Sequence, residues 1–278
     1  MAAGLPPLFF VLGEPKSGTT WLQLALNSHP EVICKGEGKF HYFRDRLAEA
    51  GVAYNRFIKE RNTKVFGSET FPPIKIGDVD YLFGQFVERR LREGEMKPGL
   101  RQLGSKDPDF GLYIMEYAAL FPRAAYLHVI RDPRDACVSM AHHMRRVHPE
   151  VNHGSFDSVL IDTARGWRNY IATVRAEAAS RNLKYLEFTY EEMAADAGAT
   201  LTRIFDFLDV DVQAETVARC IDASSFRLLS NGRDPGQEDR SSFFRKGIAG
   251  GWVKDLTPAQ ADAVMSATGD IARGLGYA

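Results

Sequence analysis

Short apolar runs alternate with longer amphipathic stretches along most of the chain. Residues 8–12 (LFFVL) are wholly apolar and precede a Gly/Pro turn, which is typical of a strand buried on both faces of a parallel sheet. Residues 19–28 then place Leu22, Ala25 and Leu26 on one side of a helix. The chain is therefore predicted to begin with a strand, a turn and a helix.

The same alternation continues toward the C-terminal end. Further buried strands are predicted to end at Lys106 and at Arg131, and the first half of residues 183–193 alternates like a strand. Helical spacing is found in four more stretches, at residues 113–124, 155–180, 198–210 and 257–276. The last of these begins with Thr257 as a favourable N-cap, followed by a proline.

Strands that alternate with helices predict an α/β fold of three layers, with a central, mainly parallel sheet covered by helices on both faces. In such sheets, ligands bind beyond the carboxyl ends of the strands. Gly and Pro are scattered rather than gathered in a linker, and no repeat or low-complexity tract interrupts the 278 residues. We therefore expect a single domain over residues 1–278.

Composition and charge narrow the classes of partner. The chain is 45% hydrophobic and 26% charged with a formal net charge of −1, so it lacks the basic footprint of proteins that bind nucleic acid or a membrane surface. No stretch approaches about eighteen consecutive apolar residues, so no membrane span is predicted. Cys34, Cys137 and Cys220 are odd in number and lack metal-ligand spacing, which indicates reduced thiols. These features together predict a cytoplasmic protein.

The turn at residues 13–20 (GEPKSGTT) has the composition of an anion-binding loop. Backbone N–H groups and the helix dipole converge there, and Gly18 lets a ligand approach the backbone closely. Side-chain donors are the ammonium of Lys16 and the hydroxyls of Ser17, Thr19 and Thr20. The alternative is an ordinary capped turn. Loops that bind triphosphates carry their lysine directly after the second glycine, where this chain has Thr19, and no later strand ends in an acidic residue for Mg²⁺.

Three further segments accompany the loop PKSGTTW (15–21): VIRDPRDACVS (129–139), FTYEEM (188–193) and FFRKGIAGGW (243–252). In this order, they resemble four motifs of sulfotransferases that use 3′-phosphoadenosine 5′-phosphosulfate (PAPS): the 5′-phosphosulfate loop, the 3′-phosphate motif, the segment near the adenine and the C-terminal R-K-G-x-x-G-x-W motif. One departure is Gly251, where an Asp is common.

The resemblance implies the P-loop NTPase-like architecture of sulfotransferases, with PAPS as co-substrate and no metal. By the same resemblance, PAPS would contact Lys16, Ser17, Gly18, Thr19, Thr20, Trp21, Arg131, Ser139, Tyr190, Phe226, Arg245, Lys246 and Gly247. PAPS carries two separated anions, and the sequence offers two separated sets of cations, which agrees with this assignment. Core packing is the alternative for Trp21 and Phe226.

The resemblance also implies that Lys16 neutralises the leaving phosphate. It does not by itself identify the base that accepts the proton of the acceptor. The histidine of the K-T-H motif in the phenol and steroid branch is missing, since the matching stretch is Lys106-Asp107-Pro108. This stretch resembles the tyrosylprotein and carbohydrate branch, whose base is usually a glutamate shortly after the first helix. Glu37 stands there and is predicted to be the base, with His41 and Asp107 as rivals and a solvated loop carboxylate as the alternative. Lys106 would contact the sulfonate or form a structural ion pair.

Two other stretches, residues 142–155 and 78–100, have no assigned chemical role. Residues 142–155 hold four histidines, but neither their spacing nor a neighbouring carboxylate completes a metal site. We therefore predict no metal. These residues, and residues 78–100, are interpreted either as a lid facing the acceptor or as ordinary surface.

The predicted reaction is transfer of the sulfonate of PAPS to a hydroxyl group, or less readily an amine, of an acceptor. The acceptor could be a small molecule, a glycan or a peptide, because acceptor pockets are built from variable loops. The sequence leaves a homo-oligomer open. Two alternatives remain: a small-molecule or nucleotide kinase, which shares the loop and the sheet, and a catalytically silent protein that binds PAPS.

Overall fold

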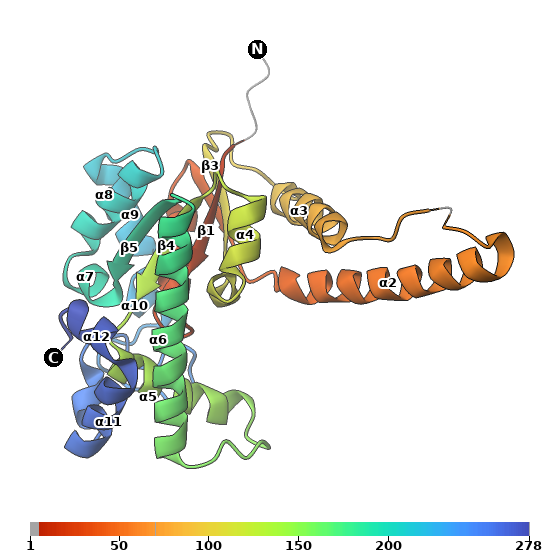
Figure 1. Cartoon of the computed structure of the whole chain (residues 1–278). Coiled ribbons are helices and arrows are strands. Elements are labelled where there is room, and N and C mark those ends of the chain that lie inside the picture. Colours follow the sequence, from red (N-terminus) through yellow and green to blue (C-terminus); the bar gives the residue numbers. More distant parts are fainter. Residues whose placement is uncertain (1–5, 70, 278) are drawn as a thin grey trace.

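Five strands form one parallel sheet in the order β2-β3-β1-β4-β5 (Figure 1). The computed structural model describes residues 6–69 and 71–277. The strands are β1 (Leu8–Leu12), β2 (Val32–Lys35), β3 (Gln102–Lys106), β4 (Ala125–Ile130) and β5 (Lys184–Thr189). The predicted strands are confirmed, except that the one predicted to end at Arg131 ends one residue earlier. The sequence does not predict β2, because four residues carry too short a pattern.

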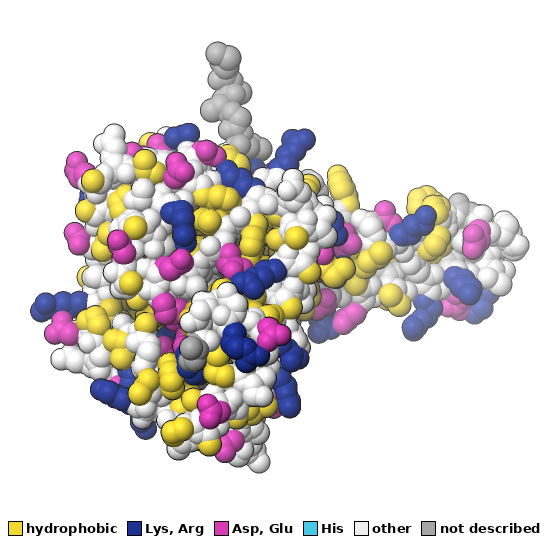
Figure 2. Space-filling model, turned by 60° about the vertical axis from the view of Figure 1, so that its left-hand side comes forward, with side chains coloured by type: hydrophobic (Ala, Val, Ile, Leu, Met, Phe, Trp, Pro, Cys, Tyr) yellow, Lys and Arg dark blue, Asp and Glu magenta, His cyan; other side chains and the backbone are white. Residues whose placement is uncertain are grey.

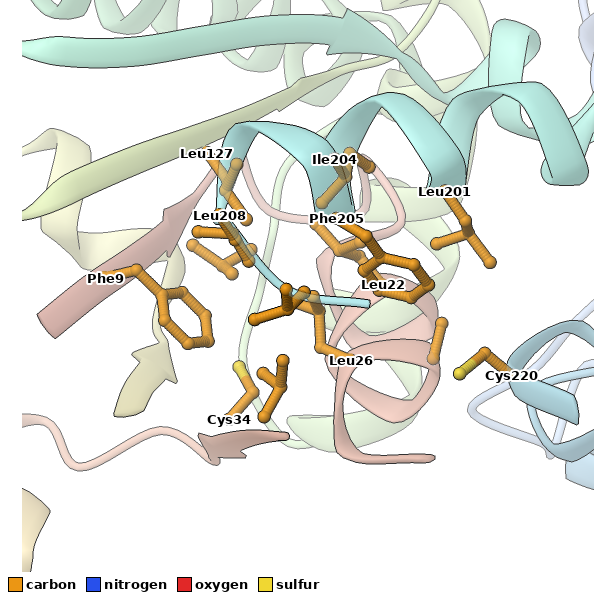
Figure 3. Close-up of a cluster of buried hydrophobic side chains, with 14 of the residues drawn as sticks. Phe9, Leu22, Leu26, Cys34, Leu127, Leu201, Ile204, Phe205, Leu208 and Cys220 are labelled. Carbon is orange, nitrogen blue, oxygen red and sulfur yellow. The ribbon is translucent and has the colours of Figure 1, made fainter. Parts of the chain in front are cut away.

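β1 distributes its side chains between two hydrophobic cores, one on each face of the sheet. Phe9 and Val11 belong to the core drawn in Figure 3, whereas Phe10 and Leu12 belong to the core on the opposite face. The first core is completed by α1 (Thr19–Ser28), α8 (Ala197–Phe207) and α9 (Ala214–Ala223). The second is completed by α3 (Ile76–Arg92), α4 (Ile114–Leu120) and α6 (Phe156–Ser180). The three-layer α/β fold is thereby confirmed.

The stretch predicted as one helix at residues 257–276 forms two. Gly269, with φ 61° and ψ −144°, separates α11 (Pro258–Thr268) from α12 (Asp270–Gly274). The predicted N-cap is confirmed, since the Thr257 side chain accepts a hydrogen bond from the backbone N–H of Gln260. The other elements of the body are α5 (Pro133–Val147) and four short ones: a 3₁₀ turn (Pro108–Gly111), α7 (Tyr190–Ala195), α10 (Phe226–Leu229) and a 3₁₀ turn (Gly251–Lys254).

A helical arm projects from one side of the molecule (Figure 1). Its described elements are α2 (Phe40–Arg61), a π-helical turn (Asn62–Phe66) and α3. The amide side chain of Asn55 exchanges two hydrogen bonds of 2.7 Å with the backbone of Ile74, which ties α2 to the segment that leads back to α3. No helix in the described part of the chain combines the length and the apolar character needed to cross a membrane.

The parallel arrangement brings five chain segments to the same edge of the sheet. All strands point the same way, so the residues that follow their carboxyl ends meet there. This edge carries Lys16 after β1, Glu37 after β2, Lys106 at the end of β3, Arg131 after β4 and Tyr190 after β5.

Candidate active site

The turn between β1 and α1 is held in a conformation that few residues adopt. Lys16 and Gly18 have φ angles of 77° and 95°, in the left-handed region. A Cβ atom on Gly18 would lie 2.6 Å from the ring of Tyr190, so only glycine fits between the turn and the start of α7. The buried hydroxyl of Ser17 has no hydrogen-bond partner among the described residues, as expected of a donor that awaits an anion.

Burial shifts the pKa values of two side chains in this turn, Lys16 and Glu14. Burial lowers the pKa of the Lys16 ammonium to about 8, and the positive charges of Arg146 and Arg131 act in the same direction. The Lys16 Nζ atom lies 4.3 Å from the centre of the Phe243 ring, a distance typical of a cation–π contact. Burial also raises the pKa of Glu14 to about 8, and its Oε2 atom has no partner among the described residues.

Arg131 connects the first turn to the C-terminal part of the chain. Its guanidinium donates to the carbonyl oxygen of Lys16 at 3.2 Å and to that of Ile248 at 3.0 Å. The guanidinium carbon lies 4.4 Å from the centre of the Tyr190 ring, and the nearest carboxylate, that of Asp135, is 3.6 Å away. The Arg131 guanidinium is therefore fixed between the turn after β1 and the segment around Ile248, which lies more than a hundred residues later in the chain.

The C-terminal segment, residues 226–252, is held in place by Arg233 and Asp135. Arg233 donates to the backbone carbonyls of Arg245 at 3.0 Å and Phe244 at 2.6 Å. Asp135 accepts hydrogen bonds from the backbone N–H groups of Gly250 at 2.7 Å and Trp252 at 2.8 Å. This irregular segment consequently has a defined path over the end of the sheet.

Two cations on this segment are already paired. Arg245 lies 2.7 Å from a carboxylate oxygen of Glu238, and the ammonium of Lys246 lies 2.7 Å from that of Asp255. Next to them, Gly247 has a φ angle of 63°, and a Cβ atom there would lie 2.1 Å from the Phe226 ring. Gly247 thus packs flat on the ring of Phe226.

A cavity of about 970 Å³ opens between the first turn and the C-terminal segment. Among the residues predicted as site residues, those that line it are Lys16, Gly18, Thr19, Thr20, Trp21, Glu37, Arg131, Ser139, Tyr190, Phe226, Arg245, Lys246 and Gly247. The predicted residues Ser17 and Lys106 are buried and do not line the cavity. Neither His41 nor Asp107, the rival bases, lines the cavity.

Glu37 is held by two ammonium groups. Lys106 Nζ lies 2.6 Å from Oε1 of Glu37, and Lys39 Nζ lies 3.0 Å from Oε2. Partial burial disfavours the charge on Glu37, but the hydrogen bonds from Lys106 and Lys39 outweigh it and hold the pKa of Glu37 below its usual value. The carboxylate therefore stays ionised at neutral pH, which is the form that accepts a proton.

Lys39 is the residue of this network that sequence reasoning misses. Besides Glu37, its ammonium contacts Asp107 at 2.8 Å and Asp109 at 2.9 Å, and its backbone N–H donates to Asp107. Lys39 has a φ angle of 45° and immediately precedes α2. The only local signal is its position two residues after Glu37, because its carboxylate partners lie about seventy residues further along the chain.

Residues 142–155 take part in the site only at their start. α5 extends to Val147, and His143, Met144, Val147 and His148 line the cavity. Burial, aided by the charge of Lys16, lowers the pKa of His143 to about 4, so its imidazole is neutral at neutral pH. Residues 78–100 do not line the cavity. Within residues 6–69 and 71–277, no three His, Cys, Asp or Glu side chains gather in a way that could hold a metal ion.

Comparisons with known proteins agree with the fold and with the order of the motifs. A family model described as "Sulfotransferase family" matches residues 7–214. Protein-tyrosine sulfotransferase 1 of Danio rerio is 27% identical over 208 residues, which cover 73% of this chain and 53% of that protein. The chain thus spans about half the length of this relative.

Two solved structures share the fold across nearly the whole chain. A mouse sulfotransferase complexed with PAP superposes with a TM-score of 0.60 at 20% identity, covering 96% of this chain and 85% of the other. A sulfotransferase domain from the curacin biosynthetic pathway superposes with a TM-score of 0.55 at 17% identity, covering 99% of both chains. Because the family model matches well over half of the chain, the protein belongs to the sulfotransferase family.

Proposed function

We propose that this protein transfers the sulfonate group of PAPS to a hydroxyl group of an acceptor and releases 3′,5′-ADP. The observation that carries the proposal is one cavity lined by the Lys16 turn, which Arg131 contacts, and by Arg245 and Lys246 of the C-terminal segment. PAPS presents a phosphosulfate and a separate 3′-phosphate, and such anions are bound by cationic side chains like these. The unpartnered hydroxyl of Ser17 supports the assignment of the turn to an anion.

The reaction needs only groups that meet in this cavity. The acceptor oxygen forms a bond to sulfur while the bond between sulfur and the bridging phosphate oxygen breaks. Lys16 neutralises the charge that develops on the departing phosphate, and Glu37 accepts the proton of the acceptor hydroxyl. Glu37 is favoured over His41 and Asp107 as the base because it lines the cavity. Lys106, hydrogen-bonded to Glu37, fixes the carboxylate.

Aromatic side chains complete the nucleotide end. Trp21, Tyr190 and Phe226 line the cavity, and the rings of Trp21 and Tyr190 meet edge to face with centres 5.5 Å apart. Such surfaces stack on a flat purine. Ser139 adds a hydroxyl beside them for the 3′-phosphate.

The acceptor shares the cavity with the nucleotide. A volume of about 970 Å³ is at the upper end of ligand pockets, which leaves space for a second molecule. The curated relative from Danio rerio is named for sulfation of protein tyrosine. We include the hydroxyl of a small molecule, a glycan or a peptide in the proposal, and we place the whole reaction in one domain over residues 1–278.

The protein is expected to bind 3′,5′-ADP equally well with and without Mg²⁺, because side-chain cations replace the metal. ATP–Mg²⁺ should bind at least about tenfold more weakly, a difference of about 1.4 kcal/mol. Isothermal titration calorimetry with both nucleotides, each with Mg²⁺ or EDTA, measures this. Tight binding of ATP–Mg²⁺ with no binding of 3′,5′-ADP would contradict the proposal and favour the kinase alternative.

Transfer is tested separately from binding. ³⁵S-labelled PAPS is incubated with a phenol, a tyrosine peptide, a sugar and a fractionated cell extract, and the labelled product is identified by mass spectrometry. A protein that binds 3′,5′-ADP but labels nothing in any of these mixtures is a silent PAPS-binding protein, which would refute the proposed transfer.

The affinity for 3′,5′-ADP is expected to fall as the pH rises above about 8. In this range the free protein loses the positive charge of Lys16 and gains a negative charge on Glu14, since both groups have a pKa of about 8. Binding an anion then requires proton uptake, so log Kd rises by up to about one per pH unit for each group. Calorimetry between about pH 7 and 9.5 measures the slope. Lys16→Met and Glu14→Gln should each reduce it, whereas a flat profile in the wild type would rule the effect out.

A further inference from the structure

The ion pairs around Glu37 differ from those on the surface of the molecule. Figure 2 shows Lys and Arg side chains interspersed with Asp and Glu over the body and the arm, and exposed pairs of this kind contribute little. Around Glu37, by contrast, the side chains of Asp107 and Lys106 are only 1% and 5% exposed. Charges that are shielded from water act more strongly on one another, so the arrangement of this cluster affects the chemistry of Glu37.

Lys39 is the member of the cluster that joins three carboxylates. Its ammonium lies 3.0 Å from Glu37, 2.8 Å from Asp107 and 2.9 Å from Asp109. Partial burial disfavours the charge on Lys39, but the hydrogen bonds to Asp107, Asp109 and Glu37 outweigh it and raise the pKa of Lys39 above its usual value. An ammonium group has three N–H donors, so three acceptors share the single charge of Lys39.

The two aspartates hold Lys39 from more than one side. The Asp107 carboxylate accepts a hydrogen bond from the backbone N–H of Lys39 at 3.1 Å, in addition to the bond from its ammonium. It also accepts one from the backbone N–H of Asp109 at 3.1 Å, which fixes the two aspartates relative to each other. Both ends of Lys39 are therefore attached to the turn that follows β3.

That turn is in turn attached to the anion-binding loop. The hydroxyl of the buried Tyr170, on α6, donates a hydrogen bond to the carbonyl oxygen of Pro108 at 2.6 Å. The same hydroxyl accepts a hydrogen bond from the backbone N–H of Gly13 at 2.9 Å, at the start of the turn that carries Lys16. The position of Lys39 relative to the Lys16 turn is thereby set by a chain of buried hydrogen bonds.

The cluster is suited to a proton that arrives at Glu37. Lys106 holds Oε1 and Lys39 holds Oε2 of this carboxylate, and each oxygen keeps a second lone pair for a proton. The cluster sets two ammonium groups against the three carboxylates of Glu37, Asp107 and Asp109. When Glu37 becomes neutral, Lys39 still has both aspartates as partners, so its charge remains paired.

We propose that Lys39 is a positioning residue for Glu37: held by Asp107 and Asp109, its ammonium fixes one carboxylate oxygen and so orients the base toward the acceptor hydroxyl. The two aspartates compete with Glu37 for the same ammonium, which limits how strongly Lys39 stabilises the ionised carboxylate. This inference rests on the proposed function, because it takes Glu37 as the base.

The titration of Glu37 itself measures this control. Besides Lys39, the charged and titratable groups that act on it include Lys106 at the end of β3, Lys16 in the turn after β1 and His143 on α5. His143 has a pKa of about 4 and overlaps with a carboxylate in any activity profile, so the carboxyl group has to be observed directly. A ¹³C NMR titration of the whole chain, labelled at the glutamate carboxyl carbons, does so without turnover, and the Glu37 signal is the one lost in Glu37→Gln.

The two kinds of variant should shift this titration in opposite directions. Lys39→Met should raise the pKa of Glu37, because a cation beside the carboxylate is lost, whereas Asp109→Asn should lower it, because a competitor for Lys39 is lost. Lys35→Met is the matched control. Lys35 precedes Glu37 by two residues as Lys39 follows it, but its ammonium donates to the backbone carbonyls of Arg90 and Glu93, so this variant should leave the titration unchanged. An unchanged Glu37 in Lys39→Met, or an equal rise in Lys35→Met, overturns the inference.

Transfer kinetics separate positioning from a purely structural role. Lys39→Met should lower kcat about 10–10²-fold, the cost of a misplaced reacting group, and leave the affinity for 3′,5′-ADP nearly unchanged. Lys39→Arg keeps the charge and should restore most of the rate, with circular dichroism as the check on folding. Wild-type kcat in Lys39→Met beside an inactive Glu37→Gln would refute the positioning role. A wild type that transfers no sulfonate would refute the proposed reaction instead, while the NMR titration still decides whether Lys39 controls Glu37.

Discussion

Replacing Glu37 with glutamine is expected to lower the rate of sulfonate transfer about 10²–10⁴-fold while leaving the affinity for 3′,5′-ADP nearly unchanged. The glutamine amide keeps the size of the side chain but does not accept a proton at neutral pH. Glu37 lines the cavity with both carboxylate oxygens held by Lys106 and Lys39, so its position is fixed while its role in binding the nucleotide is small. The loss should therefore appear in kcat.

The measurement uses ³⁵S transfer to whichever acceptor of the panel is labelled fastest, with calorimetry of 3′,5′-ADP beside it. His41→Gln is the matched control, since His41 lies near Asp109 behind the cavity lining. Its rate should stay within about tenfold of the wild type, below the range of a lost general base. Wild-type turnover of Glu37→Gln would show that Glu37 is not the base, and a large loss in His41→Gln would move that role to His41.

Replacing Lys16 with methionine is expected to reduce transfer about 10²–10³-fold, the usual loss on removing one group that stabilises developing charge. Binding of 3′,5′-ADP should weaken as well, because the same ammonium faces the 5′-phosphate. Stability should change in the opposite direction. Burial lowers the pKa of Lys16 to about 8, so keeping this ammonium charged at neutral pH opposes folding, and an apolar side chain of similar length relieves that cost.

Transfer kinetics and thermal melting at pH 7 test the two effects together. Lys184→Met is the control, because Lys184 begins β5 at the opposite edge of the sheet and forms its ion pair with the exposed Asp209. It should change neither quantity appreciably. If Lys16→Met lowers the melting temperature and leaves turnover intact, Lys16 acts as a structural residue and not as a catalytic one.

The sequence predicts those parts of the site that depend on local geometry. The turn after β1 is predicted from a buried strand, a Pro-Lys-Ser-Gly pattern and a helix start, all within about a dozen residues. Arg131 is placed correctly because a residue that follows a buried parallel strand emerges at the ligand edge of the sheet. Gly247 and Phe226 are each named from a motif resemblance, and the structure adds that the two residues are in direct contact.

The sequence does not predict contacts between segments that lie far apart along the chain. Lys39 becomes part of the site only because β2 and β3 are neighbours, which brings Asp107 and Asp109 to its ammonium. Phe243 is recognisable as part of a motif, but its position over Lys16 depends on the path of the whole C-terminal segment. The arm is missed for a different reason. α2 packs mainly against α3 and leaves many apolar side chains exposed, so it lacks the broad buried stripe that marks a helix packed on a sheet.

The clasp formed by Arg233 and Asp135 has a kinetic consequence. The segment they hold supplies one wall of the cavity, and Arg131 joins that wall to the first turn through the carbonyls of Lys16 and Ile248. In the proposed reaction, we expect the spent nucleotide to depart only when some of these hydrogen bonds break. The maximal turnover would then depend on how often the wall opens rather than on the speed of bond exchange at sulfur.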